Sequence, residues 1–320
     1  MRIDQYIACQ QQPFLSLELV PPRRGGSVND IFKTIDQLIS YSPKFINVTN
    51  RCNSVIFKNC KGKPVKTPLN NKPGTLGVSV AINQKFNIPT VPHLVVSGMD
   101  KFELEDLLIN LNYLGFKNIF VIRGDQAEPD TFLDQNPDQY QYASSLVEQI
   151  NLMNQGIYST SALNNTPTEF CIGVAGYPEK HYQAVNFDYD LNYLKQKVDR
   201  GASYIITQIF YSFSTYVNFL KKARDIGIDV PIIPGLKPIT SCSQLYSLPP
   251  RFFISIPTEL AKNLESAKSP QQEWEAGIAY MNDLINQLLD FGVPAIHLFT
   301  MGKNRSVKAL LDQVKARLVK

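Results

Sequence analysis

Eight short apolar runs alternate with amphipathic segments along the 320-residue chain, and this alternation limits its fold more than any other feature. The runs are rich in Ile, Val and Phe, as β-strands are, whereas apolar residues in the intervening segments recur at helical spacing. The predicted strands are residues 14–20, 44–49, 88–96, 118–124, 170–178, 204–210, 230–236 and 295–301. The predicted helices are residues 28–40, 101–115, 141–154, 189–201, 214–227, 273–292 and 306–318.

The strand pattern indicates parallel pairing, because runs that are apolar on both faces are typical of parallel strands covered by helices. Eight such units make a (β/α)8 TIM barrel, and we predict a single barrel domain over residues 1–320 without a regulatory domain. The alternative is an open, doubly wound sheet, but no G-x-G-x-x-G motif follows the first strand. Four predicted helices end at a glycine, a common helix stop: Gly115, Gly201, Gly227 and Gly292.

Charge and cysteine content argue against several classes of protein. The formal net charge of +4 is spread along the chain, whereas nucleic acids and anionic membranes are normally bound by a concentrated basic patch. The five cysteines form no C-x-x-C pair, which argues against a disulfide framework or a zinc ribbon. Neither a signal-peptide core nor an apolar segment of about 18 residues is present. We therefore expect a soluble, cytoplasmic protein that binds neither nucleic acid nor a membrane.

Polar side chains follow nearly every predicted strand at its carboxyl end. In a barrel these ends and the loops after them form the active site. The candidates in chain order are Glu18, Thr49, Asn50, His93, Arg123, Asp125, Tyr177, Glu179, His181, Gln208, Lys237, Gln244, Thr300, Lys303 and Arg305.

Glu18 is the candidate that most suggests catalysis. It lies between Leu17 and Leu19 in an apolar strand, so its carboxyl is expected to face a cavity where desolvation raises its pKa and keeps it protonated near neutrality. A structural ion pair with an arginine inside the barrel is the other interpretation. Asp125 ends an Arg-Gly-Asp tripeptide. It either brings a charge to the barrel mouth or caps the next helix; adhesion through this motif is disfavoured because the preceding strand is predicted to be buried.

The remaining motifs leave the reaction open. The three histidines, His93, His181 and His297, lie on strands or at their ends but lack the tight spacing of metal sites. We expect no metal, and assign them to a bound cofactor or, for His297, to packing. Neither a G-x-S-x-G elbow nor a Walker loop is present. The residues alone predict a barrel enzyme with carboxylates, amides and imidazoles in its mouth, without naming its reaction.

An ordered series of segments resembles the methylenetetrahydrofolate reductase family of flavoprotein barrels. The similar segments cover almost the whole chain in the family's order. They are "SLELVPPRR" (16–24), "KFINVT" (44–49), "VPHL" (91–94), "FVIRGD" (120–125), "YASSLV" (142–147), "AGYPEKH" (175–181), "LKQKVDRGASYIITQIFY" (194–211) and "VPIIPGLKPI" (230–239).

The resemblance implies a bound FAD, NADH or NADPH as electron donor, and reduction of 5,10-methylenetetrahydrofolate to 5-methyltetrahydrofolate. It makes Glu18 the general acid and Asp125 an electrostatic partner of flavin and pterin. The residues implied to hold FAD are Thr49, His93, Arg123, Gly124, Asp125, Tyr142, Ala143, Tyr177, His181, Ala184, Asp190 and Lys197. Those implied to contact the folate substrate are Gln208, Gln244, Leu248 and either Lys303 or Arg305.

The chain departs from the family pattern in residues 50–74, in an insertion at residues 154–168 and in the "TMGKNR" segment (300–305). Two alternatives therefore stay open. One is a flavin-dependent reductase of another carbon–nitrogen double bond. The other is a flavin- or folate-binding subunit without catalysis of its own. A homo-oligomer is compatible with the sequence.

Overall fold

The structure is a computed structural model that describes residues 1–50, 54–60, 63–69, 74–124, 137–159, 165–302 and 304–318, with the backbone alone for 54–60 and 63–69. Its centre is one sheet of nine strands in the order β10-β11-β1-β2-β5-β6-β7-β8-β9. All pairings in this sheet are parallel. The predicted (β/α)8 barrel is confirmed, and the doubly wound alternative is wrong.

The nine strands occupy eight positions, because the seventh position is divided at Pro234. Its first half pairs with β8 and its second half with β11, which closes the ring. Proline has no N–H to contribute to the ladder, so the strand is interrupted there. The strands, each inside a predicted range, are β1 (Phe14–Leu19), β2 (Phe45–Val48), β5 (Thr90–Val95), β6 (Asn118–Ile122), β7 (Cys171–Gly176), β8 (Tyr204–Thr207), β9 (Ile232–Ile233), β10 (Gly235–Leu236) and β11 (Ala295–Phe299).

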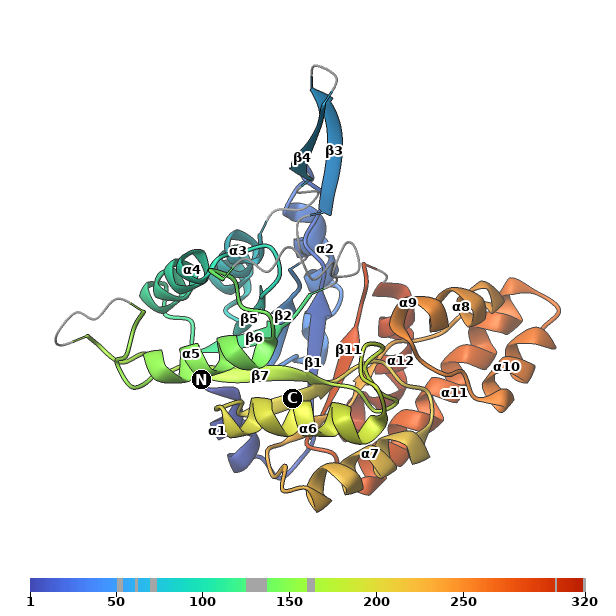
Figure 1. The fold of residues 1–320 in the computed structure, drawn as a ribbon. Coiled ribbons are helices and arrows are strands. Elements are labelled where there is room, and N and C mark those ends of the chain that lie inside the picture. The colour runs from blue at the N-terminus through green and yellow to red at the C-terminus, as the bar shows by residue number, and fades with distance from the viewer. Residues whose placement is uncertain are drawn as a thin grey trace.

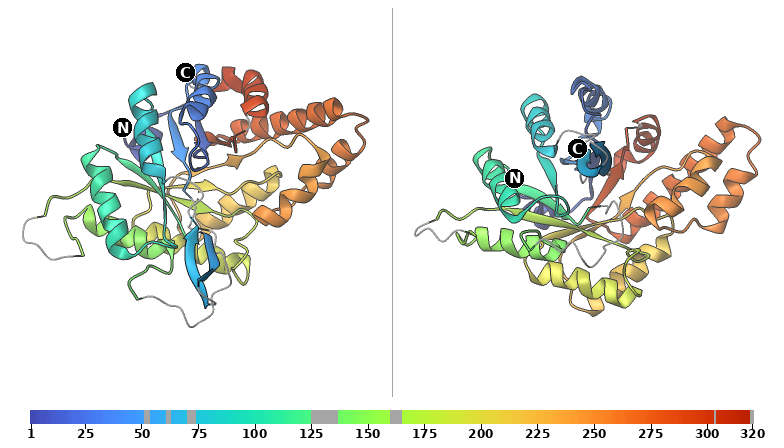
Figure 2. Two further views of the ribbon diagram at one scale, coloured as in Figure 1. Left: turned by 90° about the horizontal axis from the view of Figure 1, so that it is seen from above. Right: turned by 45° about the horizontal axis from the view of Figure 1, so that its top comes forward.

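Helices surround the strands, as Figures 1 and 2 show. Those that match the predicted ranges are α2 (Asn29–Asp36), α4 (Lys101–Tyr113), α5 (Ala143–Met153), α6 (Phe187–Asp199), α7 (Phe213–Asp225), α11 (Pro270–Phe291) and α12 (Asn304–Val314). Short 3₁₀ turns follow α2 and α12, at Ile39–Tyr41 and Lys315–Arg317. The four predicted glycine stops all have positive φ, from 77° to 117°. None of the described helices has both the length and the apolar character needed to cross a membrane.

Several elements were not predicted. Helix α3 (Thr75–Phe86) contains β-branched residues that favour strands, yet it buries Val78 and Ile82 one helical turn apart. Four others are short: α1 (Ile3–Cys9), α8 (Cys242–Ser247), α9 (Pro249–Phe252) and α10 (Thr258–Glu265). Within the divergent residues 50–74, β3 (Ser54–Cys60) and β4 (Lys63–Leu69) form an antiparallel hairpin, which projects from the body of the molecule (Figure 1).

Alternate residues of each strand face inward and outward, so each barrel strand contributes to two apolar layers. Leu15, Leu17 and Leu19 of β1 belong to the large cluster between the strands and the helices, whereas Phe14 belongs to a smaller cluster with Phe45, Val91, Phe120, Cys171, Tyr204, Ile206, Ile233, Ala295 and Ile3. The smaller cluster fills the barrel towards the amino ends of its strands. This end of the barrel, which we call the base, is therefore a packed apolar core.

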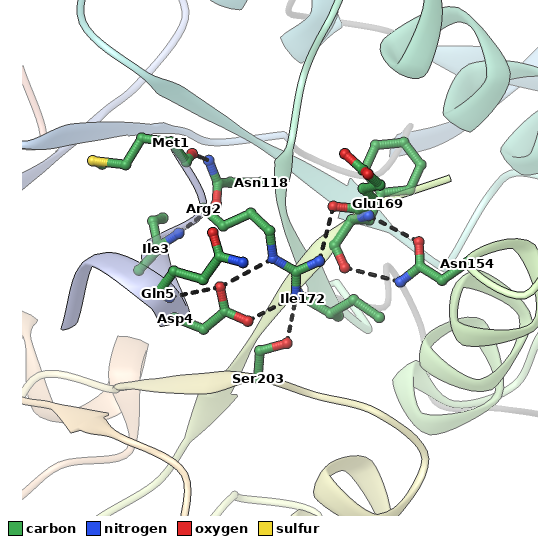
Figure 3. A network of polar contacts seen from close by, with 11 residues as sticks. Met1, Arg2, Ile3, Asp4, Gln5, Asn118, Asn154, Glu169, Ile172 and Ser203 are labelled. Carbon is green, nitrogen blue, oxygen red and sulfur yellow. Dashed lines mark hydrogen bonds and ion pairs between the residues drawn. The ribbon is translucent and has the colours of Figure 1, made fainter. Parts of the chain in front are cut away.

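Helix α1 closes the base through a network of polar contacts (Figure 3). The side chain of Asn118, at the start of β6, accepts a hydrogen bond from the N–H of Ile3 at 2.8 Å and donates one to the carbonyl of Met1 at 2.8 Å. Arg2 pairs with Asp4 at 2.7 Å. Because Ile3 is fully buried, these contacts hold an apolar side chain under the barrel.

Candidate active site

A cavity of about 290 Å³ opens at the carboxyl ends of the strands. Residues from β1, β2, β5, β6, β7, β8 and β11, or from the loops that follow them, line its walls. Nine residues predicted from the sequence to form the site lie together there: Glu18, Thr49, Asn50, His93, Arg123, Gly124, Tyr177, His181 and Gln208. The barrel topology thus gathers residues that are up to 190 positions apart in the chain.

Glu18 is the only carboxylic acid among the described residues of the cavity wall. Its side chain is 14% exposed, and burial raises the pKa of its carboxyl to about 8. At neutral pH the acid is therefore protonated and able to donate. Thr300, directly after β11, holds the end of β1, because its Oγ1 donates a hydrogen bond of 2.8 Å to the Glu18 carbonyl.

His93 is the imidazole nearest to this acid. Its Nε2 lies 3.9 Å from Glu18 Oε2, close enough for an ion pair, but burial lowers the pKa of His93 to about 3. Burial opposes charge on both groups, so they are neutral neighbours, and the distance is too long for a direct hydrogen bond. Asn47, which is paired in register with Glu18, lies 3.0 Å from the same Nε2 through its Nδ2. A neutral imidazole accepts that hydrogen bond.

Asn47 Oδ1 and His297 Nε2 are buried polar atoms in the cavity wall that have no hydrogen-bond partner among the described residues. The other ring nitrogen of His297 lies 2.9 Å from Ser16 Oγ, and burial lowers the pKa of His297 to about 3. Because buried polar atoms are nearly always satisfied, these two indicate a polar ligand. No three described His, Cys, Asp or Glu side chains gather where they could hold a metal ion.

The opposite wall is cationic. Arg123 at the end of β6 donates a 2.5 Å hydrogen bond to Gln183 Oε1, and its guanidinium carbon lies 5.4 Å from the Tyr142 ring centre. His181 is kept neutral, because burial and the charges of Lys197, Arg123 and Lys180 lower its pKa to about 4. Its backbone N–H donates to Asp190 at 2.9 Å.

Four other predicted residues, Lys197, Ala184, Tyr142 and Ala143, do not line the cavity. Lys197 donates a 2.6 Å hydrogen bond to the carbonyl of Ala175, and burial lowers its pKa to about 8. Ala184 is buried, and its carbonyl accepts from Lys180 at 2.6 Å. Tyr142 and Ala143 begin α5, where Tyr142 is 53% exposed.

The predicted substrate residues are mostly elsewhere. Gln244 Oε1 accepts the N–H of Thr240 at 2.7 Å, Leu248 is buried, and the Arg305 guanidinium lies 4.7 Å from the Trp274 ring centre. None of the three lines the cavity. Asp125 and Lys303 lie outside the described residues.

The prediction missed two groups of cavity residues. Asn47 was not predicted, and His297 was assigned to packing but lines the cavity; their period-two spacing from the inward-facing Phe45 and Ala295 is the signal that could have found them. The second group has no periodicity to reveal it, because Lys180, Tyr182 and Phe253 lie in loops and Arg251 lies in the short helix α9.

Fold and site together define a TIM-barrel protein whose ligand cavity, with a protonated acid in its wall, lies at the carboxyl ends of the strands. The sequence model described as methylenetetrahydrofolate reductase matches residues 2–315. The chain therefore belongs to the methylenetetrahydrofolate reductase family.

Individual relatives agree with this assignment. The chain is 28% identical to methylenetetrahydrofolate reductase 1 of Schizosaccharomyces pombe, over 93% of this chain and 45% of that protein. It is 28% identical to methylenetetrahydrofolate reductase (NADH) 1 of Arabidopsis thaliana, over 94% and 48%. The 5,10-methylenetetrahydrofolate reductase of Pectobacterium carotovorum is 26% identical over 90% of this chain and 86% of its own. The chain spans about half the length of the first two relatives.

A solved structure has the same fold. It is an uncharacterized protein from Clostridium thermocellum that binds two copies of 5-methyl-5,6,7,8-tetrahydrofolic acid. The TM-score is 0.60 at 14% sequence identity, and 98% of each chain is covered.

Proposed function

We propose that this chain catalyses the FAD-dependent reduction of 5,10-methylenetetrahydrofolate to 5-methyltetrahydrofolate, with NADH or NADPH as electron donor. The observation that carries the proposal is Glu18, a carboxyl with its pKa raised to about 8 in the wall of the barrel mouth. The family match from residue 2 to residue 315 supplies the reaction class. Relatives named for NADH and for NADPH both occur, in Arabidopsis thaliana and Caenorhabditis elegans, so the donor is left as either.

The residues of the cavity fit a flavin dinucleotide. Arg123 provides positive charge for a pyrophosphate. Tyr177 offers an aromatic face. Asn47 Oδ1 and His297 Nε2 lack partners in the wall, which suits the polar edge of a flavin ring. When bound, FAD supplies hydride transfer between the nicotinamide and the folate.

The proposed role of Glu18 is to hold a proton and give it to the bridge nitrogen of the folate as its one-carbon ring opens. A general acid works best when its pKa is near the operating pH, and burial brings Glu18 to that range. His93 does not take this proton away, because its pKa near 3 leaves it neutral. Gln208, at the end of β8 in the same cavity, is proposed to bind the pterin amide.

The test is a pair of half-reactions on the purified protein. We expect a yellow protein whose flavin absorbance bleaches with NADH or NADPH and returns when methylenetetrahydrofolate is added. Bleaching without recovery by the folate would favour a reductase of another carbon–nitrogen double bond. A protein that cannot be loaded with FAD would contradict both.

A further inference from the structure

Four side chains from two separate segments of the chain line one part of the cavity. Lys180 and Tyr182 lie between β7 and α6, whereas Arg251 belongs to α9 and Phe253 follows it. We call these four residues the rim cluster. They line the same cavity as Glu18, so one ligand can contact both the acid and this cluster.

The two aromatic rings of the rim cluster stack on each other. Their centres are 4.6 Å apart and their planes differ by 17°. Tyr182 nevertheless remains 45% exposed and Phe253 52%. The His181 ring, 4.7 Å from Tyr182, continues this aromatic surface along the wall. Exposed aromatic surface at the mouth of a cavity is available to a flat ligand ring.

Part of the cavity wall, including two members of the rim cluster, has an unusual backbone conformation. Five non-glycine residues in the described part of the chain have positive φ, and three of them line this cavity: Lys180 at 119°, Phe253 at 55° and Met301 at 47°. Such conformations are unfavourable for bulky residues and concentrate at ligand sites. The two loops are already joined by the N–H of Ser255, which donates to Glu179 Oε2 at 2.8 Å. The stacked pair is therefore not needed merely to connect them.

The rim cluster also determines which ligand charge is favoured at the mouth of the cavity. Lys180 and Arg251 are both cations. The single carboxylic acid among the described lining residues, Glu18, is neutral at pH 7 because its pKa is about 8. Arginine combines stacking on a ring with hydrogen bonds to phosphate or carboxylate. Rings and cations together select a planar aromatic group that carries a negative charge.

We propose that the rim cluster binds a planar aromatic ring bearing an anionic group, at the mouth of the cavity. The inference rests on the proposed function, which offers two ligands that carry such a group. One source is the adenosine half of NADPH, with its 2′-phosphate; the other is the benzoyl-glutamate half of the folate. Both ligands carry a planar ring and an anionic group, so binding of the separate fragments is needed to tell them apart.

The test measures binding of each fragment to the full chain by isothermal titration calorimetry. Adenosine 2′,5′-bisphosphate and p-aminobenzoylglutamate are titrated separately into the wild type and into Tyr182→Leu, Phe253→Leu and Arg251→Ala. We expect one fragment to bind and each variant to weaken it by about tenfold. Tyr182→Phe keeps the ring and should bind as the wild type does. Tyr113→Leu, which alters an 80% exposed tyrosine of α4, is the matched control.

The identity of the binding fragment decides the source. Binding of the bisphosphate assigns the rim cluster to the donor and predicts preference for NADPH over NADH; binding of the benzoylglutamate assigns it to the folate. The proposal is overturned when neither fragment binds, or when the rim variants bind like the wild type. Both fragments lack the nicotinamide and the pterin, so their binding needs no turnover. Fragment binding without the half-reactions would count against the proposed function alone.

Discussion

The two ends of the barrel interior differ in chemistry although the same strands build both. Along β1 the inward-facing residues change from Phe14 at the base to Ser16 and then Glu18 at the mouth. The same change occurs from Phe45 to Asn47 on β2. Val91 and His93 on β5, and Ala295 and His297 on β11, repeat it. One strand therefore serves stability at its amino end and chemistry at its carboxyl end, as expected for this fold.

Burial has a different consequence at each end. At the base it removes apolar side chains from water and stabilises the fold. At the mouth it opposes charge, which raises the pKa of Glu18 and lowers that of His93. The mouth thus contains a proton donor beside an imidazole that carries no charge. Changes at the mouth should therefore alter activity, and changes at the base should alter stability.

The largest expected effect is on activity, from Glu18→Gln at the mouth. Glutamine keeps the shape but has no acidic proton, so folate reduction should slow by about 10²- to 10⁴-fold, while flavin reduction by the nicotinamide continues at the wild-type rate. Stopped-flow absorbance of the two half-reactions measures this. Glu169→Gln, at an exposed residue paired with Lys117, is the control. Equal loss of both half-reactions would refute the acid role.

At the base, Phe45→Ala should lower the free energy of unfolding by about 3–5 kcal/mol. Phe45 is fully buried, and its ring contacts Phe14 and Tyr204 at centre distances of 6.0 and 6.4 Å. Denaturant titration measures the loss of stability. The folded fraction of the variant should show the same pH dependence of folate reduction as the wild type. If Phe45→Ala changed the pH dependence of activity as much as a substitution at Glu18 does, the base would not be limited to a role in stability.

Stability should also depend on pH through Glu18. Its pKa is about 8 in the folded protein against 4.5 for the ordinary group, so the folded protein keeps a proton that the unfolded chain releases between these values. The contribution of this proton is complete below about pH 4.5 and is lost as the pH rises through 8. Wild type should therefore lose a few kcal/mol relative to Glu18→Gln across this window, measured by denaturation at several pH values. Parallel curves for the two proteins would show that Glu18 is not desolvated.

The smallest expected effect is from Tyr204→Phe at the base. The Tyr204 hydroxyl is buried without a hydrogen-bond partner, so its removal should raise the free energy of unfolding by about 1 kcal/mol. Folate reduction should not change. A loss of stability in thermal denaturation would mean that this hydroxyl has a partner, and a loss of activity would connect the base to the chemistry.

The barrel strands were predictable because burial on both faces leaves a continuous apolar run in the sequence, and Glu18 was predictable because a carboxyl interrupts such a run. Helix α3 was missed because its β-branched residues resemble a strand. Tyr182 and Phe253 were missed for a different reason. They are 71 residues apart in the sequence and stack only because the fold brings two loops together. The spacing of residues along the chain does not predict such a contact.

The division of the seventh strand at Pro234 has a consequence for the width of the mouth. Only two residue pairs join β9 to β8, and two join β10 to β11. Each of the other neighbouring strand pairs shares three to five residue pairs, so these two joints are the shortest in the ring. Opening there would separate Gln208 from Phe299, which lie on either side of the joint and both line the cavity. The backbone pairing of the barrel is therefore sparsest on the side where Gln208 is proposed to bind substrate, next to Phe299, which is paired in register with Glu18.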